Sequence, residues 1–193
     1  MVAKGFTQVP GIDFGETYAL VTFLESVCTI LHIGATNDWD INHLDVKTEF
    51  LHGELDEEIY MEQPKGAKEL GKEDWICYLN KSLYGLHQAS QQWSKKLHNC
   101  LTKEGFTHCA AKHSIFIHTN NLRMAILAVY VDDMPVTASS PSVMSSAKAA
   151  LKKYFYIVDL GPVKWLLGIF IECDQPNHTI ALSQMAYINV IVT

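Results

Sequence analysis

The segment ILAVYVDDMPVT, residues 126–137, places two aspartates side by side inside an otherwise apolar run. Neighbouring carboxylates repel each other, and each is costly to bury without a partner. Asp132 and Asp133 therefore lie either in a solvated turn or beside a cation. An isolated pair of this kind is most simply an exposed hairpin tip, because Asp is common in turns. Other acidic residues in the chain are needed to choose between these alternatives.

The spacing of apolar residues predicts the elements that position these acids. A repeat of three or four residues predicts an amphipathic helix, and strict alternation predicts a strand. After a helix-compatible stretch at 20–39, the expected elements are a strand at 41–47, a helix at 89–104, strands at 114–119 and 124–131, a helix at 143–155 and a strand at 165–172. This β-α-β-β-α-β order predicts an α+β fold of the split-βαβ (ferredoxin-like) type, an antiparallel sheet with two helices on one face.

Three local signals refine the expected element boundaries. Thr119–Leu122 is the predicted turn between the two middle strands. Ser142 is the predicted N-cap of the helix at 143–155. Pro135 is expected to interrupt any strand that follows the aspartate pair, because proline has no N–H for a central ladder.

A third carboxylate, Asp45, stands at the end of the predicted first strand. In the split-βαβ arrangement that strand neighbours the middle strands, so Asp45 is expected to lie beside Asp132 and Asp133. Three converging carboxylates need a cation, and hard divalent ions such as Mg²⁺ take oxygen ligands. A two-ion site can activate an attacking oxygen and stabilise a leaving one. Phosphoryl transfer to a nucleotide chain fits this equipment, because its catalysis is mostly positioning and charge neutralisation.

Composition narrows the class of protein. The 193 residues, 48% apolar and 19% charged, predict one substantial globular domain, with or without a small appendage. No apolar run approaches a membrane span, and the N-terminus lacks the layout of a signal peptide. Five scattered cysteines without a CxxC pair favour a reducing, intracellular location and not secretion. The net charge of −6 argues against a generic nucleic-acid binder, but not against an enzyme that grips nucleic acid elsewhere.

Four motifs resemble the reverse transcriptase domain of Ty1/copia-type retrotransposon Pol polyproteins. In order, they are LDVKTEFLHGELDEEIYMEQPKG, KSLYGLHQASQQW, YVDD and DLGPVKWLLGI followed by ALSQMAYI. YVDD alone is a weak signal, but four linked motifs covering nearly the whole chain are specific. The resemblance implies an RNA-directed DNA polymerase that transfers nucleotides from deoxynucleoside triphosphates to a primer 3′-hydroxyl. Its partners would be an RNA or DNA template-primer and these triphosphates, with no membrane.

The resemblance also implies how the chain is divided. Residues 1–40 and 51–90 would be fingers-like, and residues 41–50 and 91–175 would form the polymerase palm. Residues 176–193 would be the truncated start of a thumb or connection. A protein of this family is expected in a cytoplasmic particle or the nucleus; the oligomeric state stays open.

Residue roles follow from the matched motifs. Asp45, Asp132 and Asp133 match the catalytic aspartates that hold two Mg²⁺ ions, with Mn²⁺ as a substitute, and the backbone carbonyl of Val46 would complete a metal shell.

Five further positions are implied to bind nucleotide or template-primer. Phe50 falls at the aromatic position that lies under the sugar and rejects a 2′-hydroxyl. Gln88, in the LYGLxQ loop, matches the element that contacts incoming nucleotide and template. Gly168 matches the hairpin that grips the primer end, and Lys4 matches the fingers strand near the triphosphate. Tyr130 either contacts the primer or packs.

Several positions depart from the family pattern. The family arginine before LVAKG has no counterpart, since Met1 stands at the leucine position. Glu49 replaces a small residue and would repel a triphosphate by like charge. His87 and Gln91 replace a usual Lys and Arg. These departures favour an alternative, a truncated and catalytically impaired retroelement remnant that keeps the fold and can still bind metal. A third alternative, a ferredoxin-like interaction domain, gives the three aspartates no role.

Two other clusters have simpler interpretations. The segment HCAAKHSIFIH, residues 108–118, invites a zinc site together with Cys100. Its spacings match no ordinary zinc pattern, which favours surface and half-buried histidines. The acidic run Glu54–Glu58 predicts a solvated loop.

Overall fold

The computed structural model describes residues 1–192 and consists of two compact units. One unit comprises Met1–Ala19 and Thr48–Asn99, and the other comprises Leu20–Lys47 and the chain from Cys100 onward. Helices and antiparallel sheets are mixed in the chain, which confirms the α+β class. No helix among the described residues is both long enough and apolar enough to cross a membrane.

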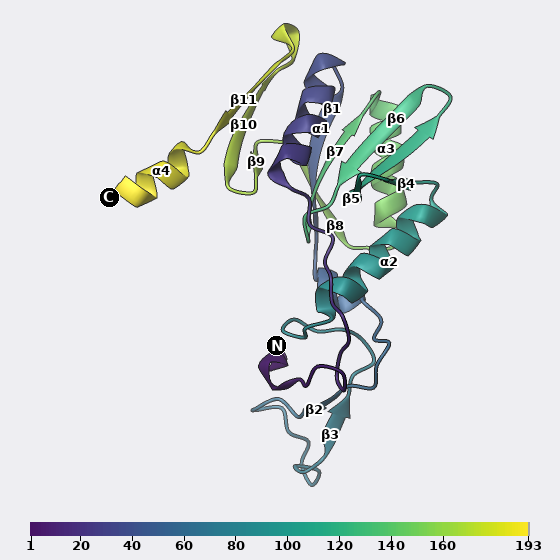
Figure 1. Cartoon of the computed structure of the whole chain (residues 1–193), viewed down its shortest axis with the longest axis vertical. Helices are drawn as coiled ribbons and strands as arrows, with labels where there is room; N and C mark the ends of the chain where they lie inside the picture. The colour runs from purple at the N-terminus through teal and green to yellow at the C-terminus, as the bar shows by residue number, and fades with distance from the viewer. Residues whose placement is uncertain (193) are drawn as a thin grey trace. The chain divides into compact units, whose positions relative to one another are not determined.

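A six-stranded antiparallel sheet is the centre of the second unit (Figure 1). Its strands lie in the order β4–β5–β6–β7–β1–β8. Their bounds are Asp40–Val46 for β1, Thr107–Cys109 for β4, Lys112–Asn120 for β5, Arg123–Ala128 for β6, Asp133–Ala138 for β7 and Ile157–Pro162 for β8. The first strand and the middle hairpin are confirmed; the hairpin turns through Asn121 and Leu122, both at positive φ.

Three strands of this sheet, β4, β7 and β8, are missing from the sequence prediction. The strand expected at 124–131 ends at Ala128, and the chain returns after the aspartate pair as β7, which lies between β6 and β1. The other neighbour of β1 is β8, not the segment 165–172. That segment is broken into β9 (Trp165–Leu166) and β10 (Ile169–Asp174). These two strands pair with β11 (Thr179–Ser183) in a separate sheet of order β11–β10–β9.

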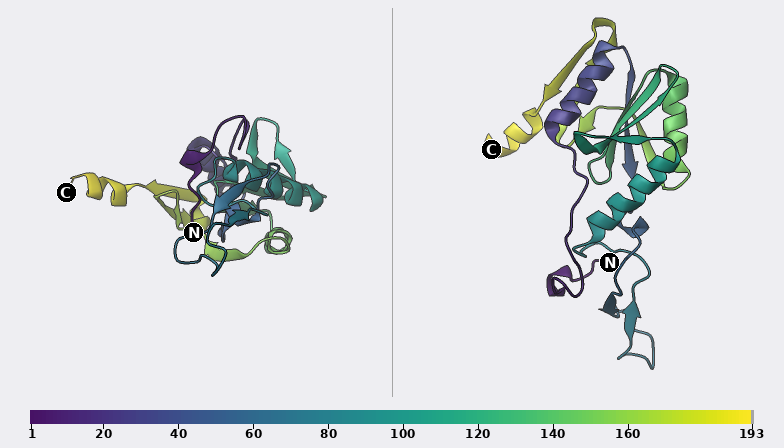
Figure 2. Two further views of the ribbon diagram at one scale, coloured as in Figure 1. Left: turned by 90° about the horizontal axis from the view of Figure 1, so that it is seen from below. Right: turned by 45° about the vertical axis from the view of Figure 1, so that its right-hand side comes forward.

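The helices are α1 (Leu24–Thr36), α2 (Ala89–Lys103), α3 (Pro141–Lys152) and α4 (Met185–Val192). A Cβ on Gly34 of α1 would meet the Ile41 side chain at 2.6 Å, while the next residue, Asn42, lines a surface pocket with Lys148 of α3. Successive strand residues point to opposite faces, so α1 and α3 cover opposite faces of the sheet (Figure 2). The prediction of Ser142 as the N-cap of α3 is wrong. Ser140 caps the helix and accepts a bond from the Val143 N–H, because Pro141 fits the first helical turn.

Helix α1 packs on both sheets of the second unit. Val27 and Leu31 belong to an apolar cluster with β9 and β10 residues such as Leu166 and Ile169. Ile30 belongs to a second cluster with β6 residues. The helix predicted to lie in the fingers-like segment 1–40 is therefore a core element of the unit that carries Asp45.

The chain that continues from β6 exchanges its hydrogen-bond partner: β6 pairs with β7, whereas Val129, just after β6, is bonded by Thr22. Pairing of β6 with β7 stops at Leu127–Val136, because Pro135 next in line has no N–H to donate. Thr22, 1% exposed, donates to the Val129 carbonyl from its N–H at 3.1 Å and from its hydroxyl at 2.7 Å. The Val129 N–H donates to the Ser114 carbonyl at 2.9 Å. The prediction that Pro135 interrupts the strand is wrong, because β7 runs through Pro135 and pairs there with His43 of β1. Thr22 fixes the strand that leads to the aspartates.

The first unit has a small core around a two-stranded ladder of β2 (Tyr60–Glu62) and β3 (Ile76–Tyr78). Residues 1–5 run against the loop that contains Gly85. A Cβ at Gly85 would meet the Ala3 carbonyl oxygen at 2.2 Å, and its φ is +92°, so only glycine fits there.

We expect Thr22→Val to destabilise the chain by about 1 to 3 kcal/mol, because it removes a buried hydroxyl bond while preserving shape. Chemical denaturation followed by circular dichroism measures this loss. Thr22→Ser keeps the hydroxyl and should retain most of the stability. Equal stability of the wild type and Thr22→Val would show that the hydroxyl bond contributes nothing net.

Candidate active site

A strained turn presents the aspartate pair. Tyr130 and Asp133 exchange backbone hydrogen bonds of 2.9 and 3.0 Å, which closes a turn over Val131 and Asp132. Val131 has φ +59°. Hairpin turns of the primed types require a positive φ at this position and usually place glycine there. A β-branched residue in this conformation costs on the order of 1–3 kcal/mol and persists only where its surroundings impose it.

The β1–β7 register brings the third aspartate to the same place. Asp45 is the direct cross-strand partner of Asp133, and the Val46 N–H donates to the Asp132 carbonyl at 3.0 Å. Directly opposite side chains have Cβ atoms about 4.5–5.5 Å apart. The predicted juxtaposition of the three aspartates at one end of the sheet is therefore present in the backbone.

Both cross-strand carboxylates already have partners. His43 Nε2 donates to Asp133 Oδ1 at 2.7 Å, since an ionised carboxylate only accepts. The Lys47 ammonium forms an ion pair with Asp45 Oδ2. The hydrogen bond to Asp45 raises the pKa of Lys47 above its ordinary value, and the charges of Asp45 and Asp132 raise it further.

The three carboxylates do not converge as a preformed metal cage. Within residues 1–192 no three His, Cys, Asp or Glu side chains form a group that could hold an ion. The side chains of Asp45 and Asp133 are instead directed to Lys47 and His43. The donor set of carboxylate oxygens still suits Mg²⁺, and the ammonium held by Asp45 shows that positive charge is accepted there.

His43 and Lys47 are absent from the sequence-predicted site, although a signal for them exists. Side chains two positions apart on a strand point to the same face. His43, Asp45 and Lys47 have this spacing at the end of β1. A basic side chain two residues before or after a strand carboxylate is therefore a sequence signal for a residue that contacts the carboxylates of that site.

Two further predicted residues lie in the second unit. Tyr130 is 36% exposed and forms backbone bridges with Val21 and Asp133. Gly168 lies in the two-residue turn between β9 and β10, where both Leu167 and Gly168 have positive φ. The predicted hairpin is thus present, and the turn geometry explains its glycine.

Three predicted residues lie in the first unit. Lys4 lines a cavity of about 610 Å³. Phe50, in the 3₁₀ turn Glu49–His52, packs edge-on against Tyr84 with ring centroids 5.0 Å apart. Gln88 has no exposed surface.

The bonds of Gln88 are internal to the unit. Its oxygen accepts from Gln8 Nε2 at 3.0 Å, and its nitrogen donates to the Asp13 carbonyl at 2.9 Å. A fully buried side chain cannot touch a ligand directly. Gln88 can influence nucleotide or template only through the segments it holds together.

Glu49, which departs from the family pattern, is also buried. It is 6% exposed, and its carboxylate accepts a bond from the Tyr84 hydroxyl at 2.8 Å. The Tyr84 hydroxyl therefore supplies a hydrogen bond to the buried Glu49 carboxylate, which would be costly to leave without a donor. The acidic loop that follows is also paired, since Lys95 and Lys96 bind Asp56 and Glu54.

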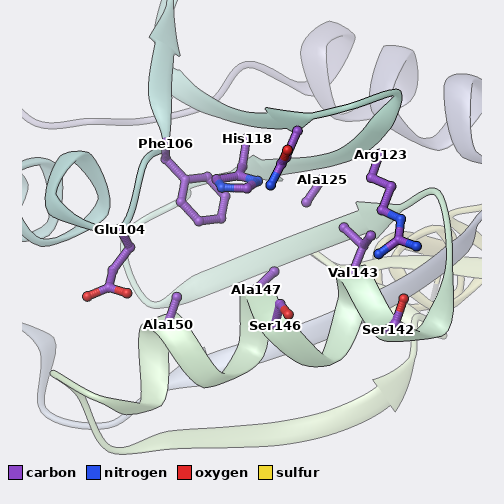
Figure 3. Close-up of a pocket in the computed structure, with 11 residues that line it drawn as sticks. Glu104, Phe106, His118, Arg123, Ala125, Ser142, Val143, Ser146, Ala147 and Ala150 are labelled. Carbon is purple, nitrogen blue, oxygen red and sulfur yellow. The ribbon is translucent and has the colours of Figure 1, made fainter.

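A separate cavity of about 330 Å³ lies between the β5–β6 hairpin and α3 (Figure 3). Phe106, His118 and Arg123 line it on the sheet side, and Val143 and Ala147 line it on the helix side. None of the predicted site residues is among its lining residues.

Comparison with known proteins places the whole chain in one family model. Residues 1–193 match the model described as Reverse transcriptase (RNA-dependent DNA polymerase). The chain is 40% identical over 189 residues to the retrovirus-related Pol polyprotein from transposon TNT 1-94 of Nicotiana tabacum, covering 97% of this chain and 14% of the relative. It is 34% identical over 188 residues to that from transposon RE1 of Arabidopsis thaliana, covering 97% and 13%. The chain thus spans about a seventh of these relatives, and no solved structure matches it.

We expect Tyr84→Phe to lower stability by about 1 to 3 kcal/mol, because the buried Glu49 carboxylate loses a donor. Denaturant titration measures the loss. Glu49→Gln in the Tyr84→Phe background serves as the matched control and should reduce it, since a neutral amide is cheaper to bury than a charge. If Tyr84→Phe proves as stable as the wild type, the hydroxyl is not what stabilises Glu49.

Proposed function

The chain belongs to the reverse transcriptase (RNA-dependent DNA polymerase) family, as a domain of a copia-type retrotransposon Pol polyprotein, and we propose that it performs the polymerase reaction itself. It would extend a primer 3′-hydroxyl with deoxynucleoside triphosphates on a nucleic-acid template. The observation that carries this proposal is the direct pairing of Asp45 with Asp133 beside the Asp132 turn.

In this proposal Asp45, Asp132 and Asp133 hold two Mg²⁺ ions, or Mn²⁺ in their place, and the Val46 carbonyl is a further ligand. The ions would supply charge neutralisation at phosphate and activation of the attacking hydroxyl. The protein contributes a rigid sheet end: β1 supplies one carboxylate, and the turn between β6 and β7 supplies two. The β1–β7 register fixes the backbone positions of the aspartates, so side-chain rotation alone would bring their carboxylates to the ions.

In this proposal residues 41–50 and 91–175 are the palm, and the six-stranded sheet with α3 lies within it. Residues 1–40 and 51–90 are the fingers-like part, and residues 176–193 are the start of the thumb or connection. Lys4 would neutralise triphosphate charge, and the segments joined by Gln88 would contact nucleotide and template. Tyr130 and the Gly168 hairpin would contact the primer.

We expect primer extension on an RNA template to require Mg²⁺ and to fall by about a hundredfold or more in Asp132→Asn, since metal-based charge stabilisation is worth several kcal/mol. Incorporation of labelled deoxynucleotide measures the rate. Asp38→Asn is a matched control, because Asp38 is exposed at φ 57°, a conformation that Asn also tolerates. Full activity in Asp132→Asn would falsify the assignment.

Phe50 is proposed to lie under the sugar and to exclude a 2′-hydroxyl. Phe50→Val should raise the use of ribonucleotides relative to deoxynucleotides by about 10 to 200-fold, the range for removing a steric contact of this size. Competing incorporation of the two sugars measures the ratio. Phe50→Tyr keeps the ring that packs on Tyr84 and should keep the discrimination. An unchanged ratio in Phe50→Val would remove Phe50 from this role.

A further inference from the structure

The end of β1 carries two nitrogen groups that contact the aspartates in opposite ways. His43 and Lys47 flank Asp45 at positions two residues away; His43 lies in β1 and Lys47 is the first residue after it. His43 contacts the carboxylate across the strand pair, Asp133, whereas Lys47 contacts Asp45. His43 donates a directional hydrogen bond from its ring, and Lys47 forms an ion pair through its ammonium.

The His43 contact is suited to orienting Asp133. His43 is only 9% exposed and its ring is held in the sheet, so the 2.7 Å bond to Oδ1 fixes the carboxylate rotation. One accepted bond leaves most lone-pair positions of an ionised carboxylate available to a cation. Loss of such supporting bonds typically costs 10 to 100-fold in metal affinity.

The Lys47 contact is suited to displacement. The Lys47 side chain is 52% exposed and the Asp45 side chain 15% exposed, so the ammonium can return to water when it leaves the carboxylate. Its ammonium occupies an oxygen of Asp45 and its charge also acts on Asp132. A divalent ion entering the site would compete with this charge for the same carboxylate.

We propose that His43 is a positioning residue that presets Asp133 for metal, and that Lys47 is a resident counter-cation that metal displaces from Asp45. The two residues then set the metal affinity of the site in opposite directions. This inference rests on the proposed function, because it takes the three aspartates as metal ligands.

The test is titration of the 193-residue chain with Mn²⁺, followed by the loss of the free-ion signal in electron paramagnetic resonance. His43→Leu should weaken Mn²⁺ binding by about tenfold or more, and His43→Gln, which keeps an N–H donor, should restore most of it. Lys47→Met should tighten binding about twofold or more, because the metal no longer competes with the ammonium for Asp45. A cooperative unfolding transition, measured without metal, shows that each variant is folded.

Double variants separate positioning from a general structural role. His43→Leu should cause no further loss in an Asp133→Asn background, and Lys47→Met should give no further gain in an Asp45→Asn background. A merely structural histidine would weaken residual binding in the Asp133→Asn background as well.

The outcomes distinguish this inference from its premise. Carboxylate-dependent Mn²⁺ binding that is unchanged in His43→Leu, or a further loss beside Asp133→Asn, would overturn the role of His43 and leave the polymerase proposal intact. Unchanged or weaker binding in Lys47→Met would overturn displacement. Wild-type binding that is absent, or equal in Asp45→Asn, would defeat the metal premise and this inference together.

Discussion

Like-charge repulsion at one end of the six-stranded sheet is the constraint on which the local structure depends. Asp45 and Asp133 are direct cross-strand partners, and like charges in that position are destabilising. The fold tolerates them because each has a nitrogen partner, Lys47 for Asp45 and His43 for Asp133. These contacts use the same two carboxylates that the proposed reaction needs, so the structure that stabilises the chain also prepares its site.

Backbone strain is concentrated at the same place and is offset by nearby hydrogen bonds. Val131 at φ +59° costs on the order of 1–3 kcal/mol, and Pro135 removes one ladder bond from β7. Thr22 bonds to Val129 just before the turn, and the reciprocal Tyr130–Asp133 bonds close the turn itself. At about 0.5–1.5 kcal/mol each, a few such bonds balance the strain of the turn. An apolar residue at position 22 would leave the strand before the turn less well held.

Sequence periodicity predicted the elements with strong, uninterrupted patterns and failed where single residues redirect the backbone. The helices at 89–104 and 143–155 and the strand at 41–47 agree closely with the structure. Strand β7 was missed because proline is rare in central strands, yet β7 runs through Pro135, which pairs with His43 of β1. The predicted strand at 165–172 is split by a turn in which Leu167 accepts a positive φ that glycine normally takes. The burial of Gln88 was not predictable, since its partner Gln8 lies 80 residues away along the chain.

Exposure explains why a histidine and a lysine at equivalent distances from Asp45 take different roles. Breaking a buried ion pair costs about 3–5 kcal/mol, so a buried lysine at position 47 would oppose any entering cation. Lys47 is instead about half in solvent, so its ammonium can leave the largely buried Asp45 carboxylate for water. His43 is buried, and its ring can stay bonded to Asp133 when that residue also binds a cation, because an ionised carboxylate has further lone pairs to offer. In the proposed site, the end of β1 would supply a ligand and the residue that orients Asp133, and the next residue, Lys47, would supply the charge that leaves when metal enters.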